Sequence, residues 1–427
     1  MSGRLRIAVY YNVGWGGGRR WLYECVSRLS AFHDIDLWCI DRDSLGPQYP
    51  DVREFALRSR AVAFRDLPRL RGPLKPLNAP MMVADLLRFE RASRRIAAEI
   101  DAAGYDLLFA SVGGYSEAPL VLRHARTRSA YYCHEPMRSL YEPQVARPYL
   151  RRPGVSQAKA AWHRFFTGGI IRRWDRQATR RAGLVIANSA YTRDYARRAY
   201  GVDAAVNYPG VDTDAFRPGD EPEERFVLSV GELIPPKGFD WSVRAMAAIP
   251  AGRRPKLVWA GHRADPREKA YVQALAAAAG VDLELRERVP DAEMKRLLRT
   301  AAVGLYTPHL EPFGLAVIES MASGTPVVAV GEAGPLETVV DGETGFLRPR
   351  DARELGAAVQ RLLEDDALRA RMGRAAREHA VRTWTWDRSV EQLQALLAGH
   401  AEGERAGAEQ PAAVDPRREV AAVRSES

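Results

Sequence analysis

The stretch VGLYTPHLEPFGLAVIESMA, residues 303–322, joins an apolar strand to a helix through a short loop. Residues 303–306 are an apolar run of strand length, and residues 315–322 have a helical pattern that should end before Gly324. A strand that leads through a loop into a helix is half of a βαβ unit. The stretch therefore predicts a parallel sheet with helices on its faces.

The same alternation continues through most of the chain. Strand-length apolar runs occur at 7–10, 35–40, 107–110, 130–133 and 184–187, and again at 226–230, 257–260, 283–285, 303–306 and 326–330. Helical patterns between them include 21–29, 81–100 (with Pro80 at its start and Gly104 at its stop) and 292–300 (with Asp291 as N-cap). The turn-rich residues 208–222 separate the two series. We therefore expect two doubly wound α/β domains in tandem.

Length and composition agree with two globular domains. The chain has 427 residues, of which 46% are hydrophobic and 27% charged, which excludes general disorder. Its three cysteines, Cys25, Cys39 and Cys133, form no zinc or disulfide pattern, and Cys133 should lie at a buried strand end. The N-terminal apolar run at 7–10 is too short for a signal peptide, and no run is long enough to span a membrane. We expect a cytoplasmic protein.

The positive charge is concentrated in one segment. Residues 138–181 hold eleven basic residues against Glu142 and Asp175, so this segment alone equals the net charge of +9. Aromatic residues are interleaved with the arginines. This composition suits an anionic membrane surface or nucleic acid, and it equally suits a solvated helix that packs on its own domain. If this segment contacts a membrane, we expect the protein to be peripheral and to lie at the inner face of that membrane.

The loop and helix at 311–319 carry the strongest chemical signal. Glu319 lies one turn beyond Leu315, on the face of the helix's first exposed amides, where a carboxylate can accept two hydrogen bonds from a diol such as ribose. Amides near Gly314 would hold a diphosphate, and Glu311 could reach a sugar hydroxyl. An ordinary capped helix with two unrelated glutamates is the alternative.

Three further features stand at strand ends. The glycines of 14–18 follow the first strand; Arg19 rules out a dinucleotide fingerprint and no lysine completes a P-loop, so the loop favours a bound anion or is a tight turn. Lys237 follows a strand and two prolines and could meet a developing phosphate charge. His134 ends a strand, where open α/β sheets place ligands, although a lone histidine is as often structural.

Together these blocks resemble the family-four retaining glycosyltransferases of the GT-B fold. The glycine loop, His134, 187–192, 207–218, 230–239 and 311–319 match in order and spacing, across most of residues 5–398. The resemblance implies two Rossmann-like doubly wound domains facing a central cleft, with a C-terminal helix crossing back to the first. The expected parts are an acceptor-side domain at 1–208, a nucleotide-sugar-binding domain at 209–382, the returning helix at 383–399 and a disordered tail at 400–427.

The resemblance also implies the roles of single residues. Glu319 would bind the ribose, Lys237 the diphosphate, and backbone near Val289 the base. Glu311 and the amides of Pro312, Phe313, Gly314 and Leu315 would hold the donor sugar and phosphates, while Gly16 and Gly17 close over the diphosphate. His134 would contact the donor sugar, so that His134, Lys237 and Glu311 form the catalytic set, with Arg138 on the acceptor side.

The expected chemistry needs neither a metal nor a cofactor. A sugar leaving a diphosphate puts negative charge on the leaving group, which fixed donors such as Lys237 and helix amides can stabilise. Asp41 and Asp43 are spaced like metal ligands of another glycosyltransferase fold, but here they follow a strand of the first domain and are interpreted as a loop. We expect activity to survive EDTA.

One residue departs from the family pattern. Glu232 stands where the family often has an arginine beside the diphosphate. An acid pointing inward there would repel the leaving group. We expect Arg263, in the loop after its own strand, to supply the missing positive charge.

The predicted function is transfer of a hexosyl group from a GDP- or UDP-sugar to an acceptor hydroxyl. The run 131–136 resembles mannosyltransferases that act on lipid-linked glycans, which favours GDP-mannose as the donor. The basic, aromatic segment favours a lipid-linked or cell-envelope glycan as the acceptor. A soluble small-molecule acceptor, a nucleotide-sugar epimerase and a non-catalytic basic binding protein are the alternatives. The ordered blocks around Lys237 and Glu311 argue against a nucleic-acid partner.

Overall fold

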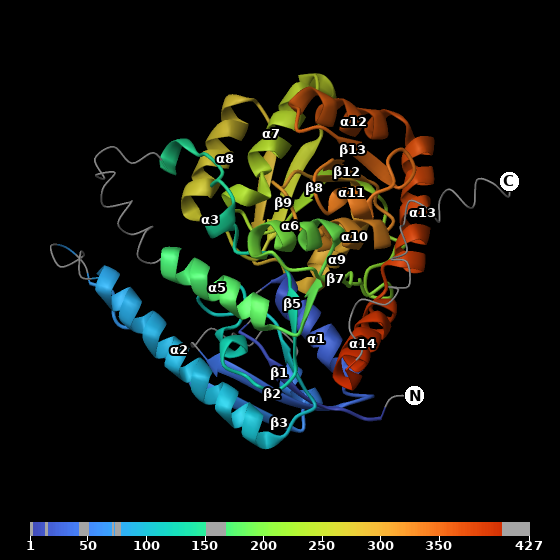
Figure 1. Ribbon diagram of the computed structural model, residues 1–427. Coiled ribbons are helices and arrows are strands. Elements are labelled where there is room, and N and C mark those ends of the chain that lie inside the picture. Colours follow the sequence, from blue (N-terminus) through green and yellow to red (C-terminus); the bar gives the residue numbers. More distant parts are fainter. Residues whose placement is uncertain are drawn as a thin grey trace. The chain divides into compact units, whose positions relative to one another are not determined.

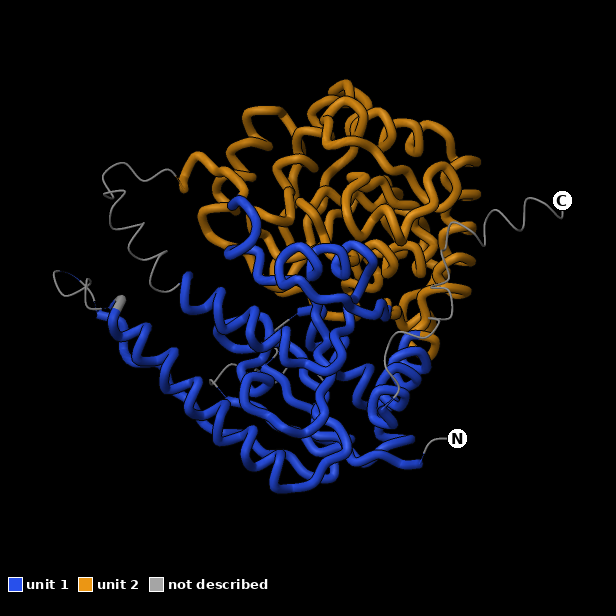
Figure 2. Tube along the Cα trace, in the orientation of Figure 1, with its two compact units in different colours: residues 1–144, 152–207, 389–411 blue, residues 145–151, 208–388, 412–427 orange. Residues whose placement is uncertain are grey.

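The computed structural model describes residues 3–12, 16–41, 51–70, 72, 78–150 and 168–403, and these form two compact units (Figures 1 and 2). Unit 1 comprises the described residues within 1–144, 152–207 and 389–411. Unit 2 comprises those within 145–151 and 208–388. The short segment 145–150 thus lies with unit 2, and the chain returns to unit 1 at Ser389.

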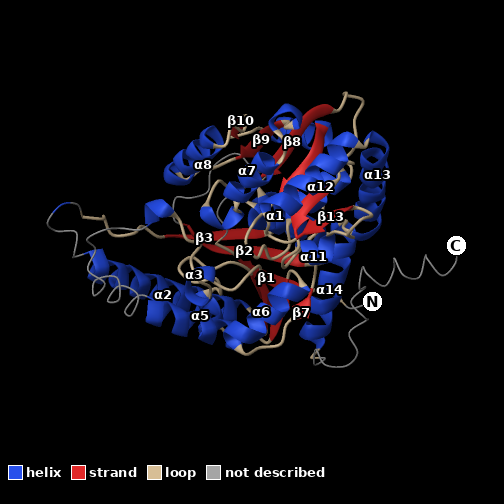
Figure 3. Ribbon diagram, turned by 90° about the horizontal axis from the view of Figure 1, so that it is seen from above, coloured by secondary structure: helices blue, strands red, loops and turns tan. Residues whose placement is uncertain are grey.

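Unit 1 is built on a parallel sheet of seven strands in the order β3-β2-β1-β4-β5-β6-β7. The strands are β1 Arg6–Tyr10, β2 Asp34–Asp41, β3 Arg58–Ala63, β4 Leu107–Ala110, β5 Ser129–Cys133, β6 Leu184–Ala187 and β7 Ala205–Val206. The helices are α1 Gly17–Leu29, α2 Asn78–Ala103, α3 Arg138–Tyr141, α5 Gly169–Arg181, α6 Ala190–Tyr200 and α14 Trp386–Glu402, with 3-10 turns η1 Val52–Phe55 and η3 Leu120–Arg123. Helices α2 and α5 cover one face of the sheet and α1 covers the other (Figures 1 and 3).

Unit 2 has a six-stranded parallel sheet in the order β10-β9-β8-β11-β12-β13. The strands are β8 Glu224–Val230, β9 Lys256–Gly261, β10 Leu283–Glu287, β11 Ala301–Tyr306, β12 Val327–Val330 and β13 Gly345–Arg348. The helices are α7 Phe239–Ala248, α8 Pro266–Ala278, α9 Asp291–Thr300, α10 Leu315–Ala322, α11 Pro335–Thr338, α12 Ala352–Glu364 and α13 Asp366–Thr383, with 3-10 turns η4 Pro148–Leu150, η6 Pro235–Lys237 and η7 Ala251–Arg253. One buried cluster joins α7 and α12 to the sheet and another joins α9, α10 and α13.

Each expected strand is present, and the α/β fold class is confirmed. The expected stops at Gly104 and Gly324 are also confirmed, because both glycines have positive φ, 67° and 81°, just beyond a helix. The Asp291 cap is wrong: Pro290 is the N-cap of α9, and Asp291 is the first helical residue. Three strands were not predicted: β3, which is mostly exposed, and the short β7 and β13.

The strand orders fix where ligands can approach. In unit 1 the order reverses between β1 and β4, and in unit 2 between β8 and β11. Open α/β sheets bind ligands at the carboxyl ends of the strands beside such a switch point. The glycine-opened α1 follows β1, the Lys237 turn follows β8, and the Glu311 loop follows β11. The sequence-predicted residues therefore lie at the switch points.

Two general properties bear on the environment of the protein. The cysteines Cys25, Cys39 and Cys133 are buried and free, with Cys133 at the end of β5 as expected. None of the helices in the described parts of the chain is both long and apolar enough to cross a bilayer.

Candidate functional site

In unit 2, two loops meet at the switch point and bring Lys237 and Glu311 together. The Lys237 Nζ lies 2.8 and 3.0 Å from the two carboxylate oxygens of Glu311. The His309 amide donates to the Pro236 carbonyl at 2.7 Å, which ties the loops to each other. The two residues predicted to meet the diphosphate and the sugar thus form one partly buried ion pair.

Gly238 makes this junction possible. It lies in the left-handed region at φ 66°, and a Cβ there would come within 2.1 Å of the Thr307 carbonyl oxygen. The Thr307 hydroxyl donates to the Gly238 carbonyl at 2.8 Å. Only glycine fits a backbone held so close to its neighbour, so the position of Lys237 is set by the turn beside it.

The N-terminus of α10 follows directly. Gly314 is its N-cap, at φ 96° and ψ 61°, and the first amides of a helix have no acceptor within the helix. Phe313 is buried against Tyr208 and Trp384, which holds the preceding loop in place. The prediction that Pro312 offers an amide is wrong, because proline has no N–H. The donors at this end are those of Phe313, Gly314 and Leu315.

The two glutamates of the block share a neighbour. Glu319 lies in α10 and is 7% exposed. Burial, followed by the charges of Glu311 and Glu319, raises the pKa of the Tyr306 hydroxyl well above its usual range. Both carboxylates therefore act on one point at the end of β11. Lys237, Glu311, Gly314 and Glu319 form a single cluster in unit 2, which we call the β11 edge.

The predicted base and charge-compensating residues lie along the same sheet edge. Val289 is buried and follows Arg288, which has a positive φ of 54°. The loop that holds Glu232 is paired with the one that holds Arg263: the Leu233 amide donates to the Arg263 carbonyl at 2.9 Å, and the Asp265 amide donates to the Leu233 carbonyl at 2.9 Å. The Arg263 side chain is exposed.

A signal that sequence reasoning missed is backbone strain. Among the described non-glycine residues, those with positive φ are Arg288, Leu310 and Ala333. They lie in the loops after β10, β11 and β12, all in unit 2. Residues other than glycine enter this region at a cost and persist there only when the surroundings impose it, often at binding sites. Nothing in the residue types reveals this conformation.

In unit 1, His134 lies in a box of aromatic rings at the end of β5. Its ring centroid is 4.8 Å from that of Trp21 in α1 and 5.0 Å from that of Tyr132. Its Nε2 lies 3.2 Å from the Ser111 hydroxyl, in the loop after β4. Burial lowers the pKa of His134 to about 4, so the imidazole is neutral at pH 7. A neutral ring can exchange hydrogen bonds with a sugar hydroxyl but does not supply a fixed charge.

Gly16 and Gly17 lie where α1 begins. Gly16 is the N-cap, with φ 123° and ψ −164°, and a Cβ built on it meets no described atom within 4 Å. Gly17 is the first helical residue. Gly18 is the next residue of the helix, and Gly14 lies outside the described residues.

Arg138, expected on the acceptor side, opens α3 and is paired at 2.8 Å with Glu142, with Glu135 at 4.0 Å. In the basic segment, Arg151, Arg152, Lys159 and Arg164 lie outside the described residues. So do Asp43 and most of the predicted tail, while Asp41 ends β2. Within the part of the chain that the structure describes, no group of three or more His, Cys, Asp or Glu side chains is placed to hold a metal ion.

Arg147 was given no role by the sequence, yet it supports the β11 edge. Its guanidinium is buried in unit 2 and pairs with Asp240 at 2.8 Å and Glu268 at 2.9 Å. It also donates to the Pro235 carbonyl at 3.1 Å, two residues before Lys237. An arginine in a basic stretch looks like any surface charge, so only the fold distinguishes it.

Comparison with known proteins gives concordant results. A family model described as "Glycosyltransferase Family 4" matches residues 15–215, and one described as "Glycosyl transferases group 1" matches 211–379. The chain is 31% identical over 293 residues to a GDP-mannose-dependent alpha-(1-6)-phosphatidylinositol monomannoside mannosyltransferase of Mycolicibacterium smegmatis, covering 61% of this chain and 74% of the relative.

Two other similarities extend the comparison. A D-inositol 3-phosphate glycosyltransferase of Acidothermus cellulolyticus is 39% identical over 203 residues, 43% of this chain and 45% of that protein, so the chain spans less than half the length of this relative. The solved structure of Anabaena Alr3699/HepE in complex with UDP and glucose superposes with a TM-score of 0.65 at 20% identity, over 93% of this chain and 100% of the other. The shared architecture is the GT-B fold.

Proposed function

Because the chain belongs to the family-four glycosyltransferases, we propose that it transfers a hexosyl group from a nucleoside diphosphate sugar to an acceptor hydroxyl, retaining the anomeric configuration and using no metal. The observation that carries this proposal is the β11 edge. There a lysine, a carboxylate and a glycine-capped helix N-terminus meet at the topological switch point.

The β11 edge suits departure of a diphosphate. When the glycosidic C–O bond breaks, electrons move to the phosphate oxygen, and preorganised donors that face it lower the barrier. The Lys237 ammonium and the amides of Gly314 and Leu315 are such donors, and the α10 dipole adds to their effect. Glu311 holds Lys237 and can accept from a sugar hydroxyl. Attack of the acceptor hydroxyl on the face that the diphosphate leaves, with the hydroxyl proton passing to the departing phosphate oxygen, preserves the configuration.

The relatives suggest the donor and the acceptor. The mannosyltransferase relative is named as GDP-mannose-dependent, and the HepE structure contains UDP; both bases therefore stay in the proposal, with a mannosyl group favoured. Both curated relatives are named for phosphorylated or lipid-borne inositol acceptors. Together with the basic segment, this supports a lipid-linked or anionic acceptor and work at the inner face of a membrane.

The first test is binding of the donor. Thermal denaturation is followed with UDP, GDP, ADP and their hexose conjugates, for the wild type, Glu319→Ala and Glu378→Ala, the last an exposed glutamate of α13. A ligand at a hundred times its Kd stabilises the folded state by about 2.7 kcal/mol. We expect one nucleotide to stabilise the wild type and Glu378→Ala but not Glu319→Ala. Failure of every nucleotide would remove the proposal.

Arg263 is proposed to provide the positive charge that Glu232 does not. Its loop is hydrogen-bonded to the loop of Glu232, and its side chain is exposed. Donor affinity should fall about tenfold in Arg263→Ala and stay unchanged in Arg253→Ala, an exposed arginine that pairs with Glu364. Equal affinities in the two variants would remove Arg263 from the site. Turnover in EDTA, compared with added Mg²⁺, tests metal independence.

A further inference from the structure

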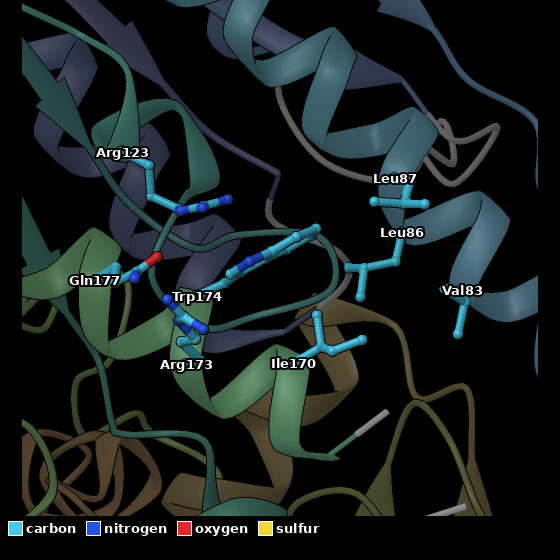
Figure 4. A pocket seen from close by; sticks show the side chains of 8 residues that line it. All are labelled: Val83, Leu86, Leu87, Arg123, Ile170, Arg173, Trp174 and Gln177. Atoms are coloured by element: carbon cyan, nitrogen blue, oxygen red, sulfur yellow. The ribbon is translucent and has the colours of Figure 1, made fainter. Parts of the chain in front are cut away.

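Unit 1 contains a pocket that the proposed transfer does not use. It lies between α2 and α5, has a volume of about 240 Å³, and is shown in Figure 4. The lining residues are Val83, Leu86 and Leu87 of α2, Ile170, Arg173, Trp174 and Gln177 of α5, and Arg123 of η3. Five of these eight are apolar and none is acidic. A pocket this small holds less than the 300–1,000 Å³ typical of drug-sized ligands, so it fits an apolar chain better than a nucleotide sugar.

The pocket has an apolar wall on each side. Leu86 is 3% exposed and forms part of the floor, whereas Leu87 is 42% exposed. In Figure 4, Leu86 and Leu87 face the pocket from α2 while Ile170 and Trp174 face it from α5. An exposed leucine of α2 and a partly exposed tryptophan of α5 therefore line one pocket from its two sides.

Positive charge is concentrated beside these walls. The Arg123 guanidinium lies over the Trp174 ring at 4.6 Å, and Arg181 donates to the Arg123 carbonyl at 2.5 Å. Burial lowers the pKa of Arg123; Arg181, Arg94 and Arg173 lower it further, against the opposing charge of Glu90. Three guanidinium groups therefore lie close enough to Arg123 to repel its charge, while Glu90, paired with Arg123 at 3.4 Å, opposes them. An anion bound beside Arg173 would offset this repulsion.

We propose that the α2–α5 pocket binds an anionic phospholipid, with one acyl chain between Leu86, Ile170 and Trp174 and the phosphate at Arg173. Apolar walls beneath a group of arginines match a chain below a phosphate, and interfacial helices bind membranes through this combination. The inference rests on the proposed work at an anionic membrane surface, and it gives that surface a defined site on unit 1.

The test uses the full chain and vesicles of equal parts phosphatidylglycerol and phosphatidylcholine, with bromine on the phosphatidylglycerol acyl chains. Bromine quenches tryptophan only at contact, and the chain has nine tryptophans. We expect vesicles to quench part of the wild-type emission, and Trp174→Phe to lose that part. Trp241→Phe, which changes a tryptophan of unit 2, is the matched control and should keep it. Equal quenching in the two variants would overturn the proposal.

Two exposed positions test the charge and the wall separately. Arg173→Gln should weaken vesicle binding about fivefold, since a basic residue near an anionic surface contributes about 1 kcal/mol; Arg58→Gln, in exposed β3, should not.

Leu87→Asp should abolish quenching of Trp174 while Leu57→Asp, at a leucine 69% exposed, leaves it. The proposed lipid site would also be contradicted if the protein bound inorganic phosphate, or vesicles that lack phosphatidylglycerol, as strongly as it binds the mixed vesicles.

The same samples separate this inference from the proposed transfer. Thermal stabilisation by the donor nucleotide reports on unit 2 and needs no vesicle. If nucleotide binding persists and vesicle quenching is absent, the lipid site alone is refuted. If quenching is present and no nucleotide binds, the lipid site stands and the proposed transfer fails.

Discussion

Two helices, α1 in unit 1 and α10 in unit 2, begin in the same way and are held very differently. Each follows a strand at a switch point, and each opens at a glycine with positive φ, Gly16 at 123° and Gly314 at 96°. A Cβ at Gly314 would lie 3.4 Å from Val317 and 3.5 Å from Tyr306, whereas one at Gly16 meets no described atom within 4 Å.

The difference lies in what surrounds the first amides of each helix. The N-terminus of α10 is enclosed by the buried Phe313 and by the Lys237–Glu311 pair, so its amides are fixed before any ligand arrives. Among the described residues, none comes within 4 Å of a Cβ built on Gly16 at the start of α1. A fixed set of donors costs no reorganisation when charge develops, so we expect the chemistry to depend on unit 2 more than on the glycines of unit 1.

The largest effect should come from removing the fixed cation. Lys237→Ala deletes the ammonium and leaves Glu311 as an unpaired carboxylate at the proposed diphosphate site. Loss of one preorganised donor costs roughly 10²- to 10³-fold in turnover. Turnover is measured as release of nucleoside diphosphate from the donor that the thermal-shift experiment identifies. Lys269→Ala is the control, because Lys269 forms an ion pair with Glu287 on the surface of unit 2. A loss under tenfold would contradict a preorganised site.

His134, at the end of β5, provides a test that depends on pH. The pKa of His134, about 4, is below its usual 6.5, so the fold favours the neutral ring. The contribution of the neutral ring to the free energy of unfolding is fully present above pH 6.5 and is lost as the pH falls towards 4. Its size is roughly 3 kcal/mol.

The measurement is the free energy of unfolding of wild type and His134→Gln between pH 7 and 4. Glu117 changes with the opposite sign, because burial raises its pKa to about 8, so the two curves are compared by their difference. The difference in free energy of unfolding between wild type and His134→Gln should become smaller as the pH falls. Parallel curves would mean that His134 is hydrated.

The two glycines can be compared directly. Gly314→Ala should destabilise the protein by about 1 to 3 kcal/mol, because the strained backbone is enclosed and cannot relax. Gly16→Ala should also cost about 1 to 3 kcal/mol, because φ 123° with ψ −164° is a conformation that essentially only glycine adopts, whatever space surrounds it. Urea unfolding of both variants gives the values. No loss of stability in one of the variants would contradict the strain assigned to that glycine.

The smallest effect should come from relieving strain next to Glu311. Leu310 has φ 46° and is 38% exposed. Asparagine tolerates the left-handed region better than leucine, so Leu310→Asn should stabilise unit 2 by about 0.5 to 1 kcal/mol. Leu57→Asn, at an exposed leucine outside that region, should not. A drop in stability would show that the Leu310 side chain holds the loop.

Much of the fold could be predicted because its signals are local. Runs such as 184–187 are apolar throughout, as buried parallel strands must be, and Gly324 stops α10 through its own backbone freedom. Strand β3 could not be predicted in this way, because Arg58, Ser59 and Arg60 are exposed at the edge of the sheet and form no apolar run.

The site could be predicted in part. Glycines and a lysine at strand ends identified the β11 edge, because sheet topology carries those ends to one place. The contact between Lys237 and Glu311 could not be predicted, since it depends on the turn at Gly238 and on the amide of His309. Arg147 and the strained Leu310 depend on the finished fold in the same way.

Arg147 also determines how the protein can be divided. A fragment cut at the obvious linker, residues 208–388, would contain Asp240 and Glu268 without the guanidinium that lies between them. Breaking a buried pair by removing one partner costs about 3 to 5 kcal/mol. Unit 2 is therefore discontinuous in sequence: recombination, truncation or domain exchange at residue 208 separates it from the described residues 145–150 that belong to it. A chimera that keeps unit 2 must keep that segment too.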